Sequence, residues 1–223
     1  MRKAVLIAGG AKRFLNEIER FREYLRTHSE VERIETLQTA YMTPPELATR
    51  IETAIRRTED SDPLLLVYAG HGGHEGWWIS ETVCFPYETL IKAIAASDQR
   101  LLIINDCCYA FALADKLAGT TVSQERVGII ASSPADEVSY SGTLQKIVES
   151  WRNKKPLAEE VDKELTVGVI HDFTGRAKQV GRFRHLVGYT LHLFLPSLFR
   201  TVPRLKIKLV DPPGARPCRA YTT

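Results

Sequence analysis

Two short motifs in this sequence combine a histidine or cysteines with residues that make tight turns. Gly-His-Gly-Gly occupies residues 70–73, and Asn-Asp-Cys-Cys occupies residues 105–108. A cysteine thiol has an ordinary pKa of about 8.5, so a neighbouring imidazole is needed to populate the nucleophilic thiolate at neutral pH. Glycines beside His71 leave room for a substrate main chain, and the amides of Gly72 and Cys108 can donate to a developing oxyanion. The two motifs together predict a thiol nucleophile, provided that the fold brings them into contact.

Both motifs follow apolar runs of the kind that form buried strands. LLLVYAG covers residues 64–70, and LLIIND covers residues 101–106. Such runs alternate with amphipathic stretches along the chain, which predicts an α/β fold: a three-layer sandwich with a mostly parallel central sheet flanked by helices. The carboxyl ends of parallel strands meet at one edge of a sheet. We therefore expect both motifs and a third strand end, ASSPADE at 131–137, to lie together.

The composition is that of a globular protein, with 44% hydrophobic and 26% charged residues among 223. No apolar run reaches the roughly 18 residues that cross a bilayer, and the apolar stretch near the start is too short for a secretory signal. The four cysteines include an adjacent pair and no Cys-x-x-Cys, which argues against a disulfide framework or a structural zinc site. We therefore expect a cytoplasmic protein with no cofactor, no resident metal and no membrane partner.

Charge divides the sequence into an acidic body and a basic C-terminal part. Residues 175–223 contain ten Lys or Arg and one acid, Asp211, for a net +9, so residues 1–174 carry −6 of the total +3. We expect one main domain over residues 1–195 and a basic extension over residues 196–223 that packs on the same domain. The basic segment is expected to dock on the acidic body, and contact with a partner or with nucleic acid is the alternative.

The combination of motifs resembles the caspase and metacaspase group of cysteine peptidases, in particular prokaryotic-type caspase-like enzymes with the caspase-hemoglobinase fold. In that group a strand ending in Gly-His-Gly is followed by one ending in Asp-Ser-Cys or Asp-Cys-Cys in metacaspases, and Gln-Ala-Cys in caspases. FPYETLIKAI (85–94) matches the intervening helix, and GIIASSPADEVSYSG (128–142) resembles the segment around the next strand. The resemblance covers about residues 3–150. His71 and Cys108 are 37 residues apart, a shorter interval than the roughly 50 of caspases.

The resemblance implies roles for individual residues. It makes His71 the catalytic histidine and Cys108 the nucleophile, and it turns Cys107 away from the substrate. Asp106 takes the place of a caspase glutamine that helps to bind an acidic side chain, where metacaspases use aspartate to accept arginine or lysine. A carboxylate on a pocket floor attracts a cation, so the implied cleavage is after Arg, with Lys second. The implied substrate-binding residues are Asp106, Ser132, Ser133 and Asp136.

Two departures from the family pattern are clear. The nucleophile is followed by Tyr109-Ala110, and the end of the first strand, Ala8 to Lys12, supplies no acid. The second acid of the pocket is expected from Asp136 or Glu137. No acidic cluster for a calcium site stands out.

Other interpretations of the same residues remain open. Cys108 can be a buried packing residue, and Asp106 can cap the helix after the turn. A metal site that joins His71 and His74 to the cysteines lacks the usual ligand spacing. The pair Trp77-Trp78 is expected to pack a hairpin.

The function expected from the sequence is that of a caspase-like cysteine endopeptidase with a Cys108–His71 dyad. Its partners would be protein or peptide substrates with a basic residue before the cut and an activating protein, and nucleic acid is not an expected partner. Proteolytic processing or that activating partner is expected to regulate it. The alternative is a catalytically silent module of the same fold that binds other proteins.

Overall fold

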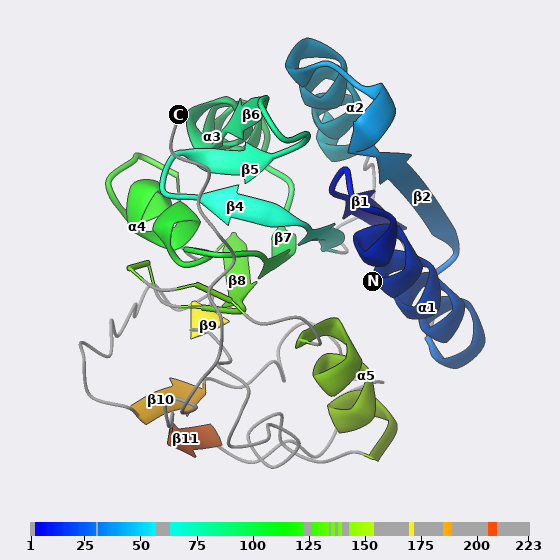
Figure 1. Ribbon diagram of the computed structural model, residues 1–223. Coiled ribbons are helices and arrows are strands. Elements are labelled where there is room, and N and C mark those ends of the chain that lie inside the picture. The colour runs from blue at the N-terminus through cyan, green and yellow to red at the C-terminus, as the bar shows by residue number, and fades with distance from the viewer. Residues whose placement is uncertain are drawn as a thin grey trace.

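A central β-sheet with helices on both faces forms the body of the protein, as the computed structural model shows (Figure 1). The structure describes residues 3–29, 31–56, 63–122, 126–133, 135–136, 138–139 and 143–153, and the backbone of 170–171, 185–188 and 205–208. The predicted basic extension, residues 196–223, therefore lies outside the described residues except for one short strand. Its packing on the main domain stays a prediction.

Within the described residues the central sheet has six strands, five of which run parallel. In spatial order they are β2 (Arg33–Gln38), β1 (Lys3–Ala8), β3 (Leu64–Ala69), β7 (Leu101–Asp106), β8 (Val127–Ala131) and β9 (Ile170–His171). Only the pairing of β8 with β9 is antiparallel among them. β3, β7 and β8 are buried along their whole length, as expected for strands covered on both faces. The strand order reverses between β1 and β3, so a crevice is expected at their carboxyl ends.

Helices cover both faces of this sheet. They are α1 (Lys12–His28), α2 (Pro44–Arg56), α3 (Tyr87–Ala95), α4 (Ala112–Ala118) and α5 (Thr143–Asn153), with a short 3-10 helix η1 (Thr39–Tyr41). α1 packs against α5, and α3 packs against both α2 and α4. Neighbouring residues of β7 show that these groups lie on opposite faces: the Asn105 side chain bonds to Tyr87 of α3, whereas Asp106 lies near α1 and α5.

Local sequence signals explain where the first two helices form. α1 buries Phe14, Ile18, Phe21 and Leu25, which recur every three or four residues and so share one face. α2 begins after Thr43, whose main-chain amide and hydroxyl both donate to Glu46, at 2.7 and 2.8 Å. In return, the Glu46 amide donates to the Thr43 hydroxyl at 3.5 Å, which completes a capping box that fixes the start of the helix.

A three-stranded antiparallel sheet connects β3 to α3. It consists of β4 (His71–Gly73), β5 (Gly76–Trp78) and β6 (Cys84–Pro86). Trp77 is fully buried, stacks on Tyr68 with ring centroids 4.4 Å apart, and donates from Nε1 to Asn105 Oδ1 at 2.7 Å. These contacts confirm the predicted packing role of Trp77 and fasten the hairpin to the ends of β3 and β7.

The predicted fold class is confirmed: the chain is α/β, with a mostly parallel sheet between helical layers. The last described strand, β11 (Leu205–Lys208), pairs with β10 (His185–Gly188) in a separate antiparallel pair. No helix within the described ranges is long and apolar enough to cross a membrane.

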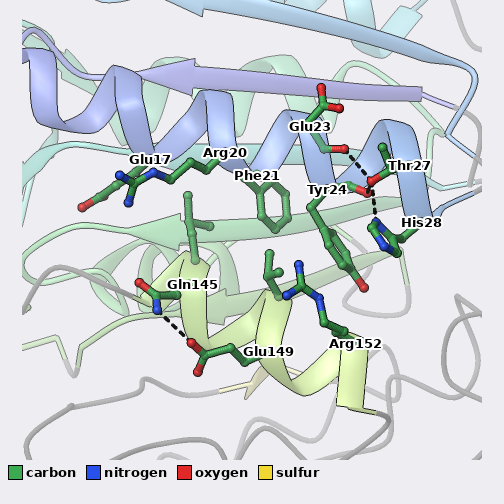
Figure 2. A pocket seen from close by; sticks show the side chains of 12 residues that line it. Glu17, Arg20, Phe21, Glu23, Tyr24, Thr27, His28, Gln145, Glu149 and Arg152 are labelled. Carbon is green, nitrogen blue, oxygen red and sulfur yellow. Dashed lines mark hydrogen bonds between the residues drawn. The ribbon is translucent and has the colours of Figure 1, made fainter.

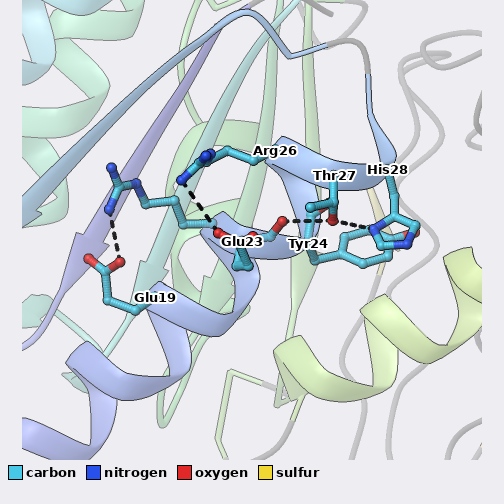
Figure 3. Close-up of polar contacts among 7 residues, drawn as sticks. Glu19, Glu23, Tyr24, Arg26, Thr27 and His28 are labelled. Atoms are coloured by element: carbon cyan, nitrogen blue, oxygen red, sulfur yellow. Dashed lines mark hydrogen bonds and ion pairs between the residues drawn. The ribbon is translucent and has the colours of Figure 1, made fainter.

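The outer side of α1 carries ion pairs between residues three positions apart (Figure 3). Arg22 and Glu19 lie 3.0 Å apart and Arg26 and Glu23 lie 3.6 Å apart, with side chains between 41% and 63% exposed. Exposed pairs of this kind contribute only about 0.2–0.5 kcal/mol each. They identify the solvent face of α1 and leave its other face for the core and the site.

Candidate active site

The turn after β7 places the two cysteines in different surroundings. Successive side chains of an extended strand point to opposite faces. Cys107 is buried against α3, with its Sγ 3.6 Å from the Tyr87 hydroxyl oxygen. Cys108 is 5% exposed, and its Sγ lies 4.0 Å from the carbonyl oxygen of Ser139, just before α5. Cys108 therefore shares a face of the sheet with Asp106, and Cys107 does not.

The environment of Cys107 keeps its thiol protonated. Burial raises the pKa of the Cys107 thiol far above its ordinary value. The hydrogen bond with Tyr87 lowers this pKa only in part, and the charge of Asp106 raises it further. A thiol held in this way is a poor nucleophile at physiological pH.

His71 is the first residue of β4, directly after the glycine that ends the β3 turn. Its carbonyl oxygen accepts a hydrogen bond of 2.7 Å from the Tyr68 hydroxyl, which fixes the main chain. The exposed imidazole lies edge-on to Phe14 at 5.0 Å between centroids, and its Nε2 is 3.3 Å from Nη2 of Arg13. A guanidinium can only donate, so Nε2 is the acceptor and a neutral His71 carries its ring proton on Nδ1.

The histidine turn and the cysteine turn touch each other at the carboxyl edge of the sheet. The amide of Gly70 donates to the carbonyl oxygen of Asp106 at 3.0 Å. The approach is closest at Gly72, where a Cβ would lie 2.5 Å from Cys107 Sγ and 2.8 Å from the Cys108 carbonyl oxygen. The structure thus brings together the two motifs that the sequence analysis singled out.

Gly72→Ala is expected to destabilise the protein because the added methyl group has no room between the two turns. Overpacking of a buried contact costs about 1–3 kcal/mol. Gly119→Ala is the matched control, since its Cβ would meet its nearest neighbour, the Lys116 carbonyl oxygen, at an ordinary 3.6 Å. Urea denaturation of both variants measures the difference in the free energy of unfolding. Equal stability of the two variants would contradict the close contact.

Asp106, at the end of β7, is a buried carboxylic acid. It is 6% exposed, and no described group hydrogen-bonds its Oδ2. Removal from water raises the pKa of Asp106 to about 7, and the negative charge of Glu17 on α1 acts in the same direction. The Ser132 hydroxyl and the Leu144 amide lower this pKa and offset only part of the rise. A carboxylate in this position lacks a counter-charge that a cationic ligand can supply.

The stability of the protein is expected to fall with rising pH because of Asp106. In the unfolded chain this group titrates near 3.8, and in the folded protein near 7, so between these values only the folded state keeps the proton. The contribution to the free energy of unfolding is full below about pH 4 and declines up to pH 7, by roughly 4 kcal/mol at most. Asp106→Asn, neutral at every pH, should flatten this slope in urea denaturation at pH 5 and pH 8. If the stability of Asp106→Asn falls with pH as steeply as that of the wild type, Asp106 is not the group that causes the pH dependence.

The remaining predicted substrate-binding residues follow β8. Ser132 and Ser133 are fully buried, and their hydroxyls donate to the Cys107 carbonyl oxygen at 3.0 and 3.1 Å. Both hydroxyls support the cysteine turn from behind, and a substrate-binding role for the two serines stays a prediction. Asp136 is exposed, and Glu137 lies outside the described residues.

A groove of about 560 Å³ between α1 and α5 was not predicted (Figure 2). It extends from Glu17 and Gln145 at one end to His28 and Arg152 at the other. Glu17 and Leu144, which both line the groove, are among the residues of these helices that influence the pKa of Asp106. Asp106 therefore lies behind one end of the groove.

Residues of α1 are the part of the site that the sequence analysis missed. Arg13 and Phe14 contact the imidazole, and Glu17 influences Asp106. The sequence did contain a signal for these residues. Because α1 directly follows β1, the first turns of α1 must lie at the carboxyl edge of the sheet. Arg13 and Glu17, four residues apart, also share one face of that helix.

Cys108, His71 and Asp106 thus belong to strand ends and turns that meet at one edge of the sheet. In the part of the chain that the structure describes, no three His, Cys, Asp or Glu side chains gather closely enough to hold a metal ion. The metal interpretation of His71, His74 and the cysteines therefore finds no support in these ranges.

Comparisons with known proteins give structural neighbours and no family. No protein-family model and no curated protein matches this chain. Protein GSU0716 from Geobacter sulfurreducens superimposes with a TM-score of 0.48 and 14% identity, over 68% of this chain and 82% of that one. The Arg-specific cysteine proteinase gingipain R superimposes with a TM-score of 0.46 and 19% identity, over 68% of this chain and 35% of its own. This chain spans about a third of that gingipain chain, so the assignment of function depends on the chain's own residues.

Proposed function

We propose that this protein is a caspase-like cysteine endopeptidase that cleaves peptide bonds after Arg, and less readily after Lys. The observation that supports this function most is the contact between the His71 turn and the Cys108 turn at the carboxyl edge of the sheet. These turns come from two separate strands and meet where α/β sheets place their ligands and catalytic groups.

The proposed reaction proceeds through an acyl-enzyme. The Cys108 thiol gives its proton to His71, and the thiolate attacks the scissile carbonyl carbon to form a carbon–sulfur bond. The amides of Gly72 and Cys108 stabilise the oxyanion, and the His71 imidazolium protonates the leaving amine as the carbon–nitrogen bond breaks. A water molecule then attacks the thioester, His71 takes its proton, and the carboxylic acid and the thiol are released.

Asp106 is proposed to select the basic residue before the cut. It lies two positions before the nucleophile, on the same face, and its Oδ2 has no hydrogen-bond partner among the described residues. A substrate guanidinium would supply the missing counter-charge and two parallel hydrogen bonds, which a lysine ammonium cannot make in the same geometry. Glu17 replaces Asp136 and Glu137 as the proposed second acid, because its charge reaches Asp106 from α1.

Access to the thiol suggests how the enzyme is regulated. Cys108 is 5% exposed, with the Ser139 carbonyl oxygen beside its Sγ. A substrate therefore needs more room at the Cys108 thiol than this conformation offers. Proteolytic processing or an activating protein partner in the cytoplasm is the proposed trigger for this opening.

The proposed function is tested with fluorogenic peptides that carry Arg, Lys or Asp before the leaving group. We expect turnover in the order Arg, Lys, Asp, either directly or after addition of calcium or a cell extract as activator. Cleavage after Asp in preference to Arg would overturn the proposed specificity. No turnover under any of these conditions would favour the alternative, a silent module of the same fold that binds protein partners.

A further inference from the structure

Buried polar side chains hold the main chain on both sides of Cys108. The side-chain amide of Asn105 donates from Nδ2 to the Ala110 carbonyl oxygen at 2.7 Å. The Ser133 hydroxyl accepts a hydrogen bond of 3.0 Å from the Ala110 amide and donates to the Cys107 carbonyl oxygen at 3.1 Å. A single hydroxyl thus bridges the residue before Cys108 and the end of the turn.

Ser132 adds a second attachment at the start of the turn. Its Oγ lies 3.0 Å from the Cys107 amide nitrogen, which donates to it, and 3.0 Å from the Cys107 carbonyl oxygen, which accepts from it. Asn105 is itself fixed, since its Oδ1 accepts from Trp77 Nε1 at 2.7 Å and its Nδ2 donates to the Tyr87 hydroxyl at 3.2 Å. Asn105 and both serines have no exposed surface, so these supports are sheltered from competing water.

The turn needs this support because its backbone is strained. Tyr109, directly after Cys108, has a φ of 55°, in the left-handed region that residues with a Cβ seldom adopt. Its ring packs on His74, with centroids 4.3 Å apart. Strain of this kind persists only where surrounding contacts determine the conformation, and it tends to occur at functional sites. If the supports are removed, the turn can relax and move the Cys108 thiol and amide.

We propose that Ser133, with Asn105 and Ser132, is a positioning residue: it holds the main chain of the turn that carries Cys108 in place beside the His71 turn. This inference rests on the proposed function and adds to it residues that touch no substrate. Small displacements of a nucleophile or an oxyanion donor reduce the rate of the chemical step far more than they reduce substrate binding. We therefore expect Ser133→Ala to lower kcat by about 10- to 100-fold while KM changes less than about twofold.

Ser29→Ala is the matched control. The Ser29 hydroxyl also donates to a carbonyl oxygen, that of Leu25 at 2.6 Å, and accepts from a main-chain amide, that of Val31 at 3.2 Å. It lies at the end of α1, at the opposite edge of the sheet from Cys108. The control therefore removes a bridge of the same kind, here a partly buried one, without touching the turn.

Two measurements on the full chain test the proposal. The first is kcat and KM with the Arg peptide. The second is the rate of iodoacetamide modification of Cys108 against pH, under native conditions, with the modified residue located by mass spectrometry. We expect Ser133→Ala to lower kcat and to shift the modification profile, and Ser29→Ala to leave both as in the wild type. Ser132→Ala is the second variant and should act in the same direction as Ser133→Ala.

The outcomes separate this proposal from the proposed function. The positioning role is overturned if Cys108 is modified at the same rate in Ser133→Ala, Ser132→Ala and Ser29→Ala. The same holds if Cys108 reacts in none of the three variants. If the wild type shows no turnover, the proposed peptidase function is overturned. The positioning role of Ser133 is then decided by the modification profiles alone. If the wild type is active, an unchanged kcat in Ser133→Ala also overturns the positioning role.

Discussion

Cys108→Ala is expected to abolish hydrolysis of an Arg peptide, whereas Cys107→Ala is expected to retain most of it. Cys108 lies on the face of the sheet that also carries Asp106, while Cys107 packs against Tyr87 with a pKa that keeps it protonated. Loss of a nucleophile lowers kcat by at least about a thousandfold. Loss of the Cys107 sulfur removes only a small buried volume and should cost roughly 1 kcal/mol of stability.

Steady-state kinetics of the two variants and the wild type decide between the cysteines. Cys107→Ala serves as the matched control, because it removes a thiol one residue away and leaves the same main chain. Thermal denaturation shows whether both variants are folded. If Cys107→Ala is inactive and Cys108→Ala is active, the assignment of the two cysteines to opposite faces is wrong.

Asp106→Asn is expected to lower kcat/KM for Arg peptides by about 30- to 1,000-fold, while the reaction of Cys108 with a small thiol probe changes little. The loss of one partner from a buried charge pair costs about 2–5 kcal/mol, and the lower part of this range, about 2–4 kcal/mol, corresponds to the expected loss. The substitution keeps the size of the side chain and removes only the charge. If kcat/KM for Arg peptides falls while the probe reaction of Cys108 is unchanged, Asp106 is the group that binds the substrate cation.

The pH dependence of the wild type gives an independent check of this role. Because the pKa of Asp106 is raised to about 7, the carboxylate that binds a cation forms only as the pH approaches neutrality. Cleavage of Arg peptides should therefore increase up to about pH 7. Glu17→Gln removes the negative charge that raises this pKa, so the increase should begin at a lower pH. An equal loss of peptide turnover and probe reaction in Asp106→Asn would instead show that Asp106 has a structural role.

The sheet and the meeting of the two motifs could be predicted because both follow from local patterns. β3 and β7 are uninterrupted apolar runs, and the carboxyl ends of neighbouring parallel strands must share an edge. The position of the hairpin also followed from sequence, since the stretch from His74 to Phe85 has the aromatic content that is typical of strands.

What the sequence could not reveal depends on contacts between distant elements. The influence of Glu17 on Asp106 depends on how α1 packs beside α5. A serine after a strand has no local signal for complete burial, and the hydrogen bonds of Ser133 are made to a turn that follows a different strand. The capping alternative for Asp106 also needed the structure: in the described part of the chain, α4 begins after Phe111 with no side-chain cap.

The incomplete hydrogen bonding of Asp106 has a thermodynamic consequence for ligand binding. At pH values below about 7 this acid carries a proton, and a bound guanidinium would lower its pKa and expel that proton into solution. Binding of an arginine side chain should therefore be accompanied by proton release, so the heat measured by calorimetry should vary with the ionisation enthalpy of the buffer. In the proposed site, a bound substrate cation would take the place of the proton that Asp106 holds.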